Sequence, residues 1–218
     1  ILLKLKYKSK LIFEIRDIWP LVAVEEGGFS NYNPLICVLS LIEKIGYYCS
    51  DLVVGTMPNL IEHVRKVSSK QIKVECIPFG YDINTNTNFI EKKSSDIMEE
   101  NDFFLKNKFT IAYVGSIGLS NGLDAFVNVI KEFSSENNIG FVFLGDGANK
   151  KNYQFILKDF QNVIFLPKVN KSQVPFFLKK FDVLYFSSLK SKVWNYGWSP
   201  NKIIDYMISE RPIIASYS

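Results

Sequence analysis

Short runs of β-branched and aromatic residues alternate with longer helical patterns along most of the chain. This alternation is typical of βαβ units, in which helices connect parallel strands. Uninterrupted apolar runs, such as residues 141–144, indicate strands that are buried on both faces of a parallel sheet. The sequence therefore predicts an α/β fold built from doubly wound parallel sheets. The expected strands are residues 11–15, 52–55, 72–77, 109–114, 140–144, 163–166, 183–186 and 212–215, and the expected helices are residues 35–49, 58–67, 122–136, 149–159, 172–180 and 200–209.

The region from Tyr81 to Lys108 interrupts the alternation, because it is rich in Asn, Thr, Ser, Lys and Glu. We interpret it as a linker between two Rossmann-like lobes. Residues 1–95 would form the first lobe with the linker, and residues 96–218 the second lobe. Ligands of such sheets bind at the carboxyl ends of the strands, so we expect functional residues in the turns that follow strands.

The net charge of +4 is accounted for by the first ten residues, which hold Lys4, Lys6, Lys8 and Lys10 and no acidic residue. The remainder of the chain has 22 basic residues (26 − 4) and 22 acidic ones. A nucleic-acid-binding protein needs a basic face that displaces counterions from phosphates, and a balanced chain does not predict one. We therefore expect no nucleic-acid partner.

The three cysteines and the one histidine do not form a pattern typical of a metal site or a catalytic triad. Cys37, Cys49 and Cys76 have no C-x-x-C spacing and are expected to be buried thiols of a reducing compartment. Together with the lack of a secretory signal pattern, they predict a cytoplasmic protein. The one histidine, His63, is expected on a surface helix, which argues against a catalytic triad or a histidine metal cluster. The sequence also has no Asp-x-Asp pair, so we expect neither a metal ion nor a cofactor.

Two glycine-rich turns follow expected strands. In the first, Gly115, Ser116 and Gly118 lie between a strand and a helix, where backbone N–H groups and a helix N-terminus suit a phosphate. The spacing is not that of the dinucleotide motif, so a plain turn between strand and helix is the alternative. In the second, Gly145 precedes Lys150, which could contact a charged ligand. There the alternative is an Asp-Gly turn with solvated lysines.

A third segment lies near the end of the sequence. Ser199 is expected to cap a helix whose first turn carries Lys202, with Asp205 one turn later on nearly the same face. A cation at the start of a helix can hold a diphosphate, and a carboxylate one turn deeper can accept hydrogen bonds from two vicinal ribose hydroxyls. The alternative is a surface ion pair between Lys202 and Asp205.

These three segments, in this order, resemble the nucleotide-sugar half of the family 4 glycosyltransferases, which are retaining enzymes of the two-lobed GT-B fold. The motifs that carry the resemblance are Gly-Leu-Asp at 122–124, Gly-Asp-Gly at 145–147, Pro167, Arg-Pro-Ile-Ile-Ala at 211–215 and, in the first lobe, elements at 49–51 and 77–82. Residues 13–20, which include Arg-Asp-Ile-Trp-Pro, look like an element of the subgroup that transfers amino-sugars onto lipid-linked precursors of bacterial surface polysaccharides.

The resemblance implies roles for residues of the second lobe. The backbone amides of Gly115 and Gly118 would contact the diphosphate of the donor. The main chain near Val169 would pair with a pyrimidine base, and Asn201 and Lys202 would flank the phosphates.

Some positions depart from the family pattern. Ser116 or Ile117 lies where many members carry an arginine. The diphosphate charge would therefore fall on Lys202, with Lys150 as a further cation. Asp205 takes the ribose position that is normally a glutamate. In the first lobe, Arg16 replaces a frequent histidine and would neutralise the leaving phosphate. Asp17 would orient the acceptor hydroxyl, and its alternative is a plain turn carboxylate.

The resemblance also implies a fragment, because whole members have a further Rossmann half before these segments and a C-terminal helix after them. On this interpretation the first lobe is incomplete and the second lacks its C-terminal end. The fragment itself would then be inactive.

The implied partners are a nucleoside-diphosphate sugar, with UDP as the expected nucleotide, and a saccharide or lipid-linked acceptor. The basic start from Lys4 to Lys10 and the aromatic residues Trp194, Tyr196 and Trp198 fit peripheral contact with the inner face of a cytoplasmic membrane. Alternatively, the lysines are solvated residues that precede the first strand, and the aromatic residues pack within their loop.

Two other functions stay open, namely an enzyme like the UDP-sugar 2-epimerases and a non-catalytic protein that binds sugar nucleotides.

Overall fold

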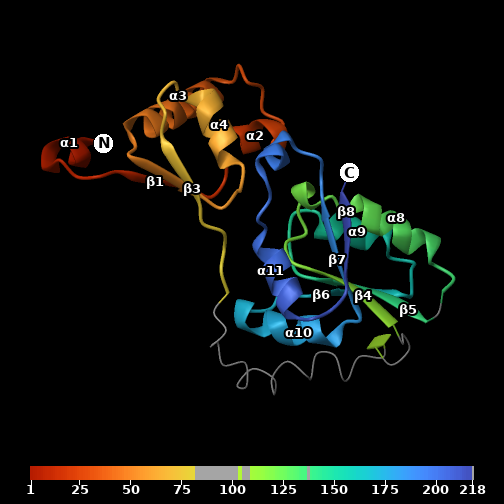
Figure 1. Ribbon diagram of the computed structural model, residues 1–218. Helices are drawn as coiled ribbons and strands as arrows, with labels where there is room; N and C mark the ends of the chain where they lie inside the picture. Colours follow the sequence, from red (N-terminus) through yellow and green to blue (C-terminus); the bar gives the residue numbers. More distant parts are fainter. Residues whose placement is uncertain (82–102, 105–108, 137, 218) are drawn as a thin grey trace. The chain divides into compact units, whose positions relative to one another are not determined.

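A computed structural model describes residues 1–81, 103–104, 109–136 and 138–217 (Figure 1). The chain forms two compact units. The first consists of Ile1–Gly80 with Lys190–Ser199, and the second of Tyr81–Leu189 with Pro200–Ser218. Most of the expected linker, residues 82–102 and 105–108, lies outside the described residues.

The first unit is built on a parallel sheet of three strands in the order β1-β2-β3. Its elements are α1 (Leu2–Tyr7), β1 (Ile12–Ile15), α2 (Leu21–Glu25), α3 (Pro34–Cys49), β2 (Leu52–Gly55), α4 (Leu60–Val67), β3 (Lys73–Cys76) and the 3₁₀ helix η4 (Lys192–Tyr196). Its core includes Ile15, Ile18, Val53 and Leu60, which are buried between the sheet and the helices.

The segment Lys190–Ser199 groups with the first unit, although its sequence position falls in the range that we assign to the second lobe. Val193 and Tyr196 are buried in the core of the first unit. The backbone N–H of Asn59 also donates to the Tyr196 carbonyl oxygen at 2.8 Å. Apolar side chains and one backbone hydrogen bond therefore hold this segment in the first unit.

The second unit contains a parallel sheet of five strands in the order β6-β5-β4-β7-β8. Its elements are β4 (Phe109–Val114), η2 (Leu119–Asn121), α8 (Asp124–Glu132), β5 (Ile139–Leu144), α9 (Lys150–Ile156), β6 (Val163–Leu166), η3 (Lys171–Gln173), α10 (Val174–Lys180), β7 (Val183–Ser188), α11 (Asn201–Ile208) and β8 (Ile213–Tyr217). Helices α8 and α9 cover one face of this sheet, and α10 and α11 cover the other (Figure 1). The order of strands reverses between β4 and β7, which is where open α/β sheets bind ligands.

The expected α/β fold with doubly wound parallel sheets is confirmed, and each expected strand lies within two residues of an observed one. Two short helices were not expected. The run Leu2–Tyr7 alternates Leu and Lys like a strand entry but forms α1. Both residue types favour helix, and Lys4 Nζ bonds to the Cys49 carbonyl oxygen at 2.7 Å. Helix α2 has five residues, too few to give a periodic signal.

Two predictions of burial were wrong. His63 is buried rather than exposed, because its Nε2 lies 2.6 Å from Glu43 Oε1 and its ring packs edge-on against Tyr196. Among the cysteines, Cys37 and Cys76 are exposed. A single histidine or cysteine can lie on the buried or on the exposed face of a short helix or strand. The local sequence therefore does not determine its burial.

We expect Tyr206→Phe to destabilise the protein by about 1–3 kcal/mol, because it would leave a buried N–H group without its acceptor. The Tyr206 hydroxyl accepts from the Val114 N–H at 2.8 Å and lies 3.0 Å from the Val114 carbonyl oxygen, so it fixes α11 to the end of β4. Urea denaturation measures the change. Tyr153→Phe is a control, because its hydroxyl bonds at 3.2 Å to an exposed carboxylate, that of Asp124, which water can solvate in the variant. Equal losses for both variants would contradict the assignment.

Candidate functional site

The turn after β4 contains Gly115 in a conformation that favours glycine, with φ +145°. Its N–H donates to the Leu144 carbonyl oxygen at 2.9 Å, so it is not the free amide that the resemblance implies. A Cβ atom on Gly115 would lie 2.5 Å from Lys202 Cε. The absence of a side chain therefore makes room for the Lys202 side chain beside the turn.

The turn after β5 packs directly on the turn after β4. A Cβ atom on Gly145 would lie 1.9 Å from the Gly115 carbonyl oxygen, and one on Gly147 would lie 2.4 Å from the Ile117 carbonyl oxygen. The Ile117 N–H also donates to the Asp146 carbonyl oxygen at 2.8 Å. Glycine lets the two backbones approach closely, so the two turns form one edge of the second unit.

Lys202 on α11 reaches this edge from the other side of β4. Its Nζ donates to Tyr113 Oη at 2.5 Å and to Asn121 Oδ1 at 3.3 Å, and it lies 4.2 Å from the centre of the Tyr113 ring. Burial lowers the pKa of Lys202 to about 8. An ammonium group has three N–H donors, and two of them have these partners within the described residues. The third can bind an anion at the mouth of the turn.

The start of α11 differs from the expected one. Pro200, not Ser199, is the N-cap residue, and no side-chain hydrogen bond caps the helix. Asn201 is the first helical residue and is exposed. Proline has no side-chain acceptor, so Pro200 cannot cap the N–H groups of the first turn of α11.

Two N–H groups of the glycine turn after β4 are available to a ligand. Neither the Ser116 N–H nor the Gly118 N–H has a hydrogen-bond partner in the part of the chain that the structure describes. Ser116 is exposed, and its carbonyl oxygen accepts from Tyr113 Oη at 2.5 Å, which fixes the orientation of the turn. These N–H groups and the Lys202 ammonium group therefore lie at the same edge of the second unit.

Other expected site residues occupy the same edge with different partners. Lys150 Nζ donates to the carbonyl oxygens of Gly145 at 2.7 Å and Leu166 at 3.0 Å, so it joins the ends of β5 and β6. Asp205 is mostly buried, with a side chain 16% exposed, and forms an ion pair with the exposed Lys171 of η3. Val169 is partly buried in the loop between β6 and η3.

Arg16 and Asp17 follow β1 in the first unit and are exposed. Arg16 Nε donates to Glu14 Oε1 at 3.2 Å. Burial raises the pKa of the Glu26 carboxyl group, and the neighbouring charge of Asp17 adds to this increase. Glu26, whose carboxyl group has a raised pKa, is therefore a candidate for proton transfer that the sequence did not indicate.

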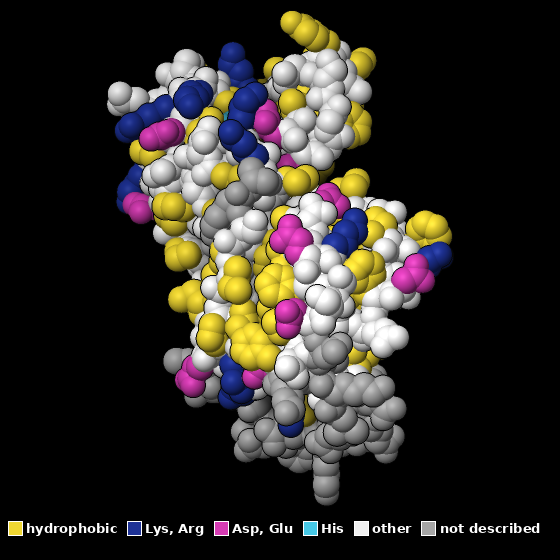
Figure 2. All heavy atoms as spheres, turned by 90° about the vertical axis from the view of Figure 1, so that its right-hand side faces the viewer, with side chains coloured by type: hydrophobic (Ala, Val, Ile, Leu, Met, Phe, Trp, Pro, Cys, Tyr) yellow, Lys and Arg dark blue, Asp and Glu magenta, His cyan; other side chains and the backbone are white. Residues whose placement is uncertain are grey.

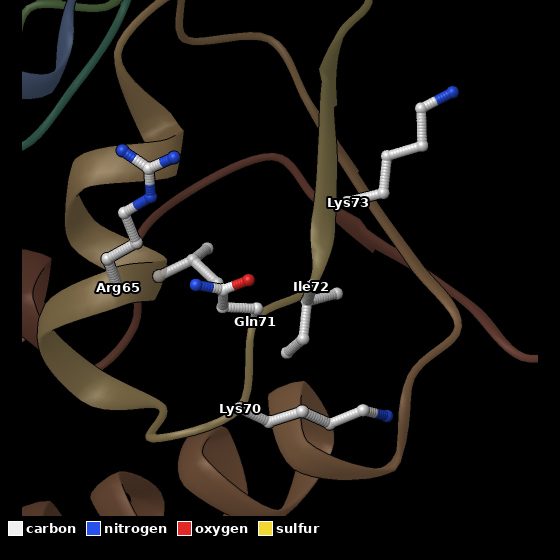
Figure 3. Close-up of a pocket in the computed structure, with 6 residues that line it drawn as sticks. Arg65, Lys70, Gln71, Ile72 and Lys73 are labelled. Atoms are coloured by element: carbon white, nitrogen blue, oxygen red, sulfur yellow. The ribbon is translucent and has the colours of Figure 1, made fainter.

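A cavity of about 310 Å³ lies elsewhere in the first unit, beside α4 and β3 (Figure 3). Although Arg65, Lys70 and Lys73 line it, the two ammonium groups point away from Arg65. Lys70 Nζ donates to the carbonyl oxygens of Tyr48 and Ser50, and Lys73 pairs with Glu75 at 2.9 Å. The cations are therefore not gathered on a common ligand, and we do not assign the donor site to this cavity.

The sequence did not indicate Tyr113, Asn121 and Lys171 as site residues. Tyr113 lies in a buried strand and reads as a core residue, and its bond to Lys202 joins residues 89 positions apart. Asn121 precedes Gly122, which has φ +58°. A glycine directly after it is the signal in the sequence that could have pointed to Asn121. Lys171 is one of many exposed lysines until α11 is placed beside η3.

The surface differs between the two units. Figure 2 shows Lys and Arg side chains gathered mainly over the first unit. The first unit has 12 basic and 8 acidic residues, a net charge of +4, and the rest of the chain has 14 of each. Among the described residues, no helix is both long enough and apolar enough to cross a membrane.

A sequence comparison with protein families matches residues 108–218, just over half of the chain, to the family described as "Glycosyl transferases group 1". A comparison with curated proteins finds no significant match. Many solved structures are similar. One is Anabaena Alr3699/HepE in complex with UDP and glucose, with a TM-score of 0.67 and 13% identity over 98% of this chain and 55% of that protein.

Two further solved structures support the same fold. WaaG, a glycosyltransferase involved in lipopolysaccharide biosynthesis, has a TM-score of 0.65 and 13% identity over 94% of this chain and 55% of that protein. The pneumococcal O-GlcNAc transferase GtfA, in complex with UDP and GlcNAc, has a TM-score of 0.61 and 14% identity over 94% of this chain and 37% of that protein. The chain thus spans about half or less of these proteins. With the parallel sheets, they show an α/β fold of the GT-B type.

Proposed function

The chain belongs to the group 1 glycosyl transferases, and from this membership we propose that it transfers a sugar from a nucleoside-diphosphate donor to a saccharide or lipid-linked acceptor. The observation that carries the proposal is the convergence of the Lys202 ammonium group with the turn at Gly115–Gly118. It creates a positively charged position at the carboxyl end of β4, which is where a diphosphate binds in sheets of this type.

The geometry supports catalysis by stabilising the leaving group. When the bond between the anomeric carbon and the diphosphate oxygen breaks, negative charge accumulates on the diphosphate. In this proposal the Lys202 ammonium group and the N–H groups of Ser116 and Gly118 stabilise that charge, and their contacts with Tyr113 support the role because they fix Lys202 and the turn. We propose that transfer is retaining and metal-independent, with Arg16 as a further cation and Asp17 orienting the acceptor hydroxyl.

UDP is the nucleotide that we propose, because the structures of HepE and of GtfA both contain UDP. In this proposal the main chain near Val169 pairs with the pyrimidine, and Asn201 flanks the phosphates. Asp205 accepts hydrogen bonds from the ribose hydroxyls. Gly145 and Lys150 hold the second turn in place beside the diphosphate.

We expect Asp205→Asn to weaken UDP binding by roughly tenfold, because an amide replaces a carboxylate that accepts two hydrogen bonds from the ribose. Pyrophosphate, which has no ribose, should bind the variant as it binds the original chain. Titration calorimetry with both ligands measures this difference. Asp159→Asn, at an exposed position after α9, is the control. Equal loss of UDP and pyrophosphate binding would contradict the ribose contact.

The pKa of Lys202, about 8, predicts how donor binding depends on pH. Below pH 8 the ammonium form predominates and binds the diphosphate. Above pH 8 the amine form predominates, so UDP affinity should fall by up to about tenfold per pH unit. Bound diphosphate favours the ammonium form and raises the pKa of Lys202 in the complex, so the fall begins near pH 8 and levels off above that higher pKa. Calorimetry between pH 6.5 and 10 measures the effect, and Lys202→Arg should abolish it. A fall that persists in the arginine variant would exclude Lys202 as its cause.

We also propose that the donor sugar is an amino-sugar and that the pathway is surface-polysaccharide synthesis in the cytoplasm at the membrane surface. The support is the stretch 13–20, with its Arg-Asp-Ile-Trp-Pro element. We further propose that this chain is part of a longer enzyme. This proposal is supported by the share of each solved relative that the chain spans.

The experiment that tests the function is a donor screen by calorimetry with UDP, dTDP, GDP and ADP, followed by transfer assays with amino-sugar donors and lipid-linked acceptors. Retention at the anomeric carbon is measured by NMR of the product. Conversion of a UDP-sugar without an acceptor would favour an epimerase. Tight UDP binding without turnover in the longest available chain would favour a binding protein. Failure to bind any nucleotide would exclude all three.

A further inference from the structure

Helix α3 of the first unit is apolar on two opposite sides. Its inner side buries Ile36, Tyr47 and Glu43, and Tyr47 packs in the core of the first unit with residues of the sheet. Its outer side carries six large apolar side chains that are 42–60% exposed. They are Leu35, Val38, Leu41, Ile42, Ile45 and Tyr48. At 100° per residue they span roughly 140° of the helix circumference, as wide as the stripe by which a surface helix normally faces a core.

The outer side is hollowed at its C-terminal half. A cavity of about 260 Å³ is lined by Leu41, Ile45 and Tyr48 together with Lys44 and residues of the turn after α4. Most of its lining is apolar, and Lys44 is exposed. A hydrocarbon chain fits the apolar part of such a hollow, and a phosphate at the end of that chain fits the ammonium group.

Helix α1 adds apolar and basic side chains next to this surface. Lys4 Nζ bonds to the carbonyl oxygen of Cys49, the last residue of α3, at 2.7 Å, and pairs with Asp51 at 2.7 Å. These contacts fix α1 at the C-terminal end of α3. Leu2, Leu3 and Leu5 are 67–82% exposed on α1.

The charges around this surface are mainly positive. Lys6, Lys8, Lys10 and Lys44 are exposed. The acids of these elements are compensated, because Asp51 pairs with Lys4, and the buried Glu43 bonds to His63 and Tyr47. A second copy of the chain would bring like charges together, whereas an anionic surface complements them.

We propose that the outer side of α3, together with α1, binds the surface of an anionic membrane. The apolar side chains enter the boundary between headgroups and acyl chains, and the lysines contact lipid phosphates. This surface differs from the aromatic one considered from the sequence, since Tyr196 is buried in the first unit. The inference extends the proposed function, because it accounts for access to a lipid-linked acceptor.

The test is co-sedimentation of the full chain with vesicles of phosphatidylcholine alone or with one quarter phosphatidylglycerol. We expect binding to the anionic vesicles and a decrease at high salt. The double variant Leu41→Ser with Ile45→Ser should reduce partitioning by roughly tenfold or more, because it removes two apolar side chains from the bilayer boundary. Each of Lys6→Gln, Lys8→Gln and Lys44→Gln should reduce it by roughly fivefold.

Phe155→Ser is the matched control, because Phe155 is 70% exposed on α9 of the second unit and lies outside the proposed surface. It should bind vesicles like the original chain. Equal binding to both kinds of vesicle, or unchanged binding of the double variant, would overturn the proposal. So would a dimer in sedimentation velocity that the double variant abolishes, since the surface would then be an interface between copies.

UDP calorimetry on the same variants separates this inference from the proposed function. The double variant should bind UDP normally. A chain that binds UDP but not anionic vesicles overturns only the membrane surface. A chain that binds the vesicles through α3 but binds no nucleotide upholds the surface and removes the proposed donor site.

Discussion

Replacing Lys202 with methionine is expected to weaken UDP binding by about a hundredfold, because it removes the cation that is held beside the first glycine turn. Methionine matches the length and apolar stem of lysine and keeps contact with the Tyr113 ring. The folded protein should lose no thermal stability, since the variant no longer buries an ammonium group. Calorimetry and a thermal melt measure the two effects.

Lys131→Met on α8 is the matched control, because this lysine is exposed and far along the helix from the turn. UDP should bind this variant as it binds the original chain. If both variants bind UDP normally, Lys202 does not hold the diphosphate, and the site must be sought elsewhere.

Gly145→Ala is expected to destabilise the protein by about 3 kcal/mol or more and to abolish UDP binding. The added Cβ atom would lie 1.9 Å from the Gly115 carbonyl oxygen, and Gly145 has φ +151°, which L side chains rarely adopt. The obstacle is backbone rather than a flexible side chain, so the two turns would have to separate. Urea denaturation and calorimetry measure the outcome.

Gly80→Ala is the matched control, because a Cβ atom there meets no atom within 4 Å. It should change stability by less than about 0.5 kcal/mol. A stable Gly145→Ala variant that still binds UDP would show that close packing of the two turns is not required for the site.

The strands could be predicted from the sequence because burial on both faces demands a continuous apolar run. The run at 141–144 and the strand β5 that contains it show this directly. Helix α1 could not be predicted, because its alternating Leu and Lys residues match the period of a strand. Lys4 also contacts the end of α3, and a local pattern does not reveal such a contact between residues 45 positions apart.

The candidate site was predictable only in part, because local patterns indicate some of its residues but not their distant partners. Glycines after strands and a cation at the start of a helix are local patterns, so they indicated Gly115, Gly145 and Lys202. The actual role of Gly115 depends on where the Lys202 side chain lies, and this depends on how α11 packs on β4. Partners distant in the sequence, such as Tyr113, leave no local pattern.

The most direct test of the account is a crystal structure of the full chain with UDP. We expect phosphate oxygens within roughly 3 Å of Lys202 Nζ and of the Gly118 N–H. We also expect the ribose to lie against Asp205. Diphosphate bound at another position, such as the cavity beside Arg65, or directed away from Lys202, would contradict the proposed donor site.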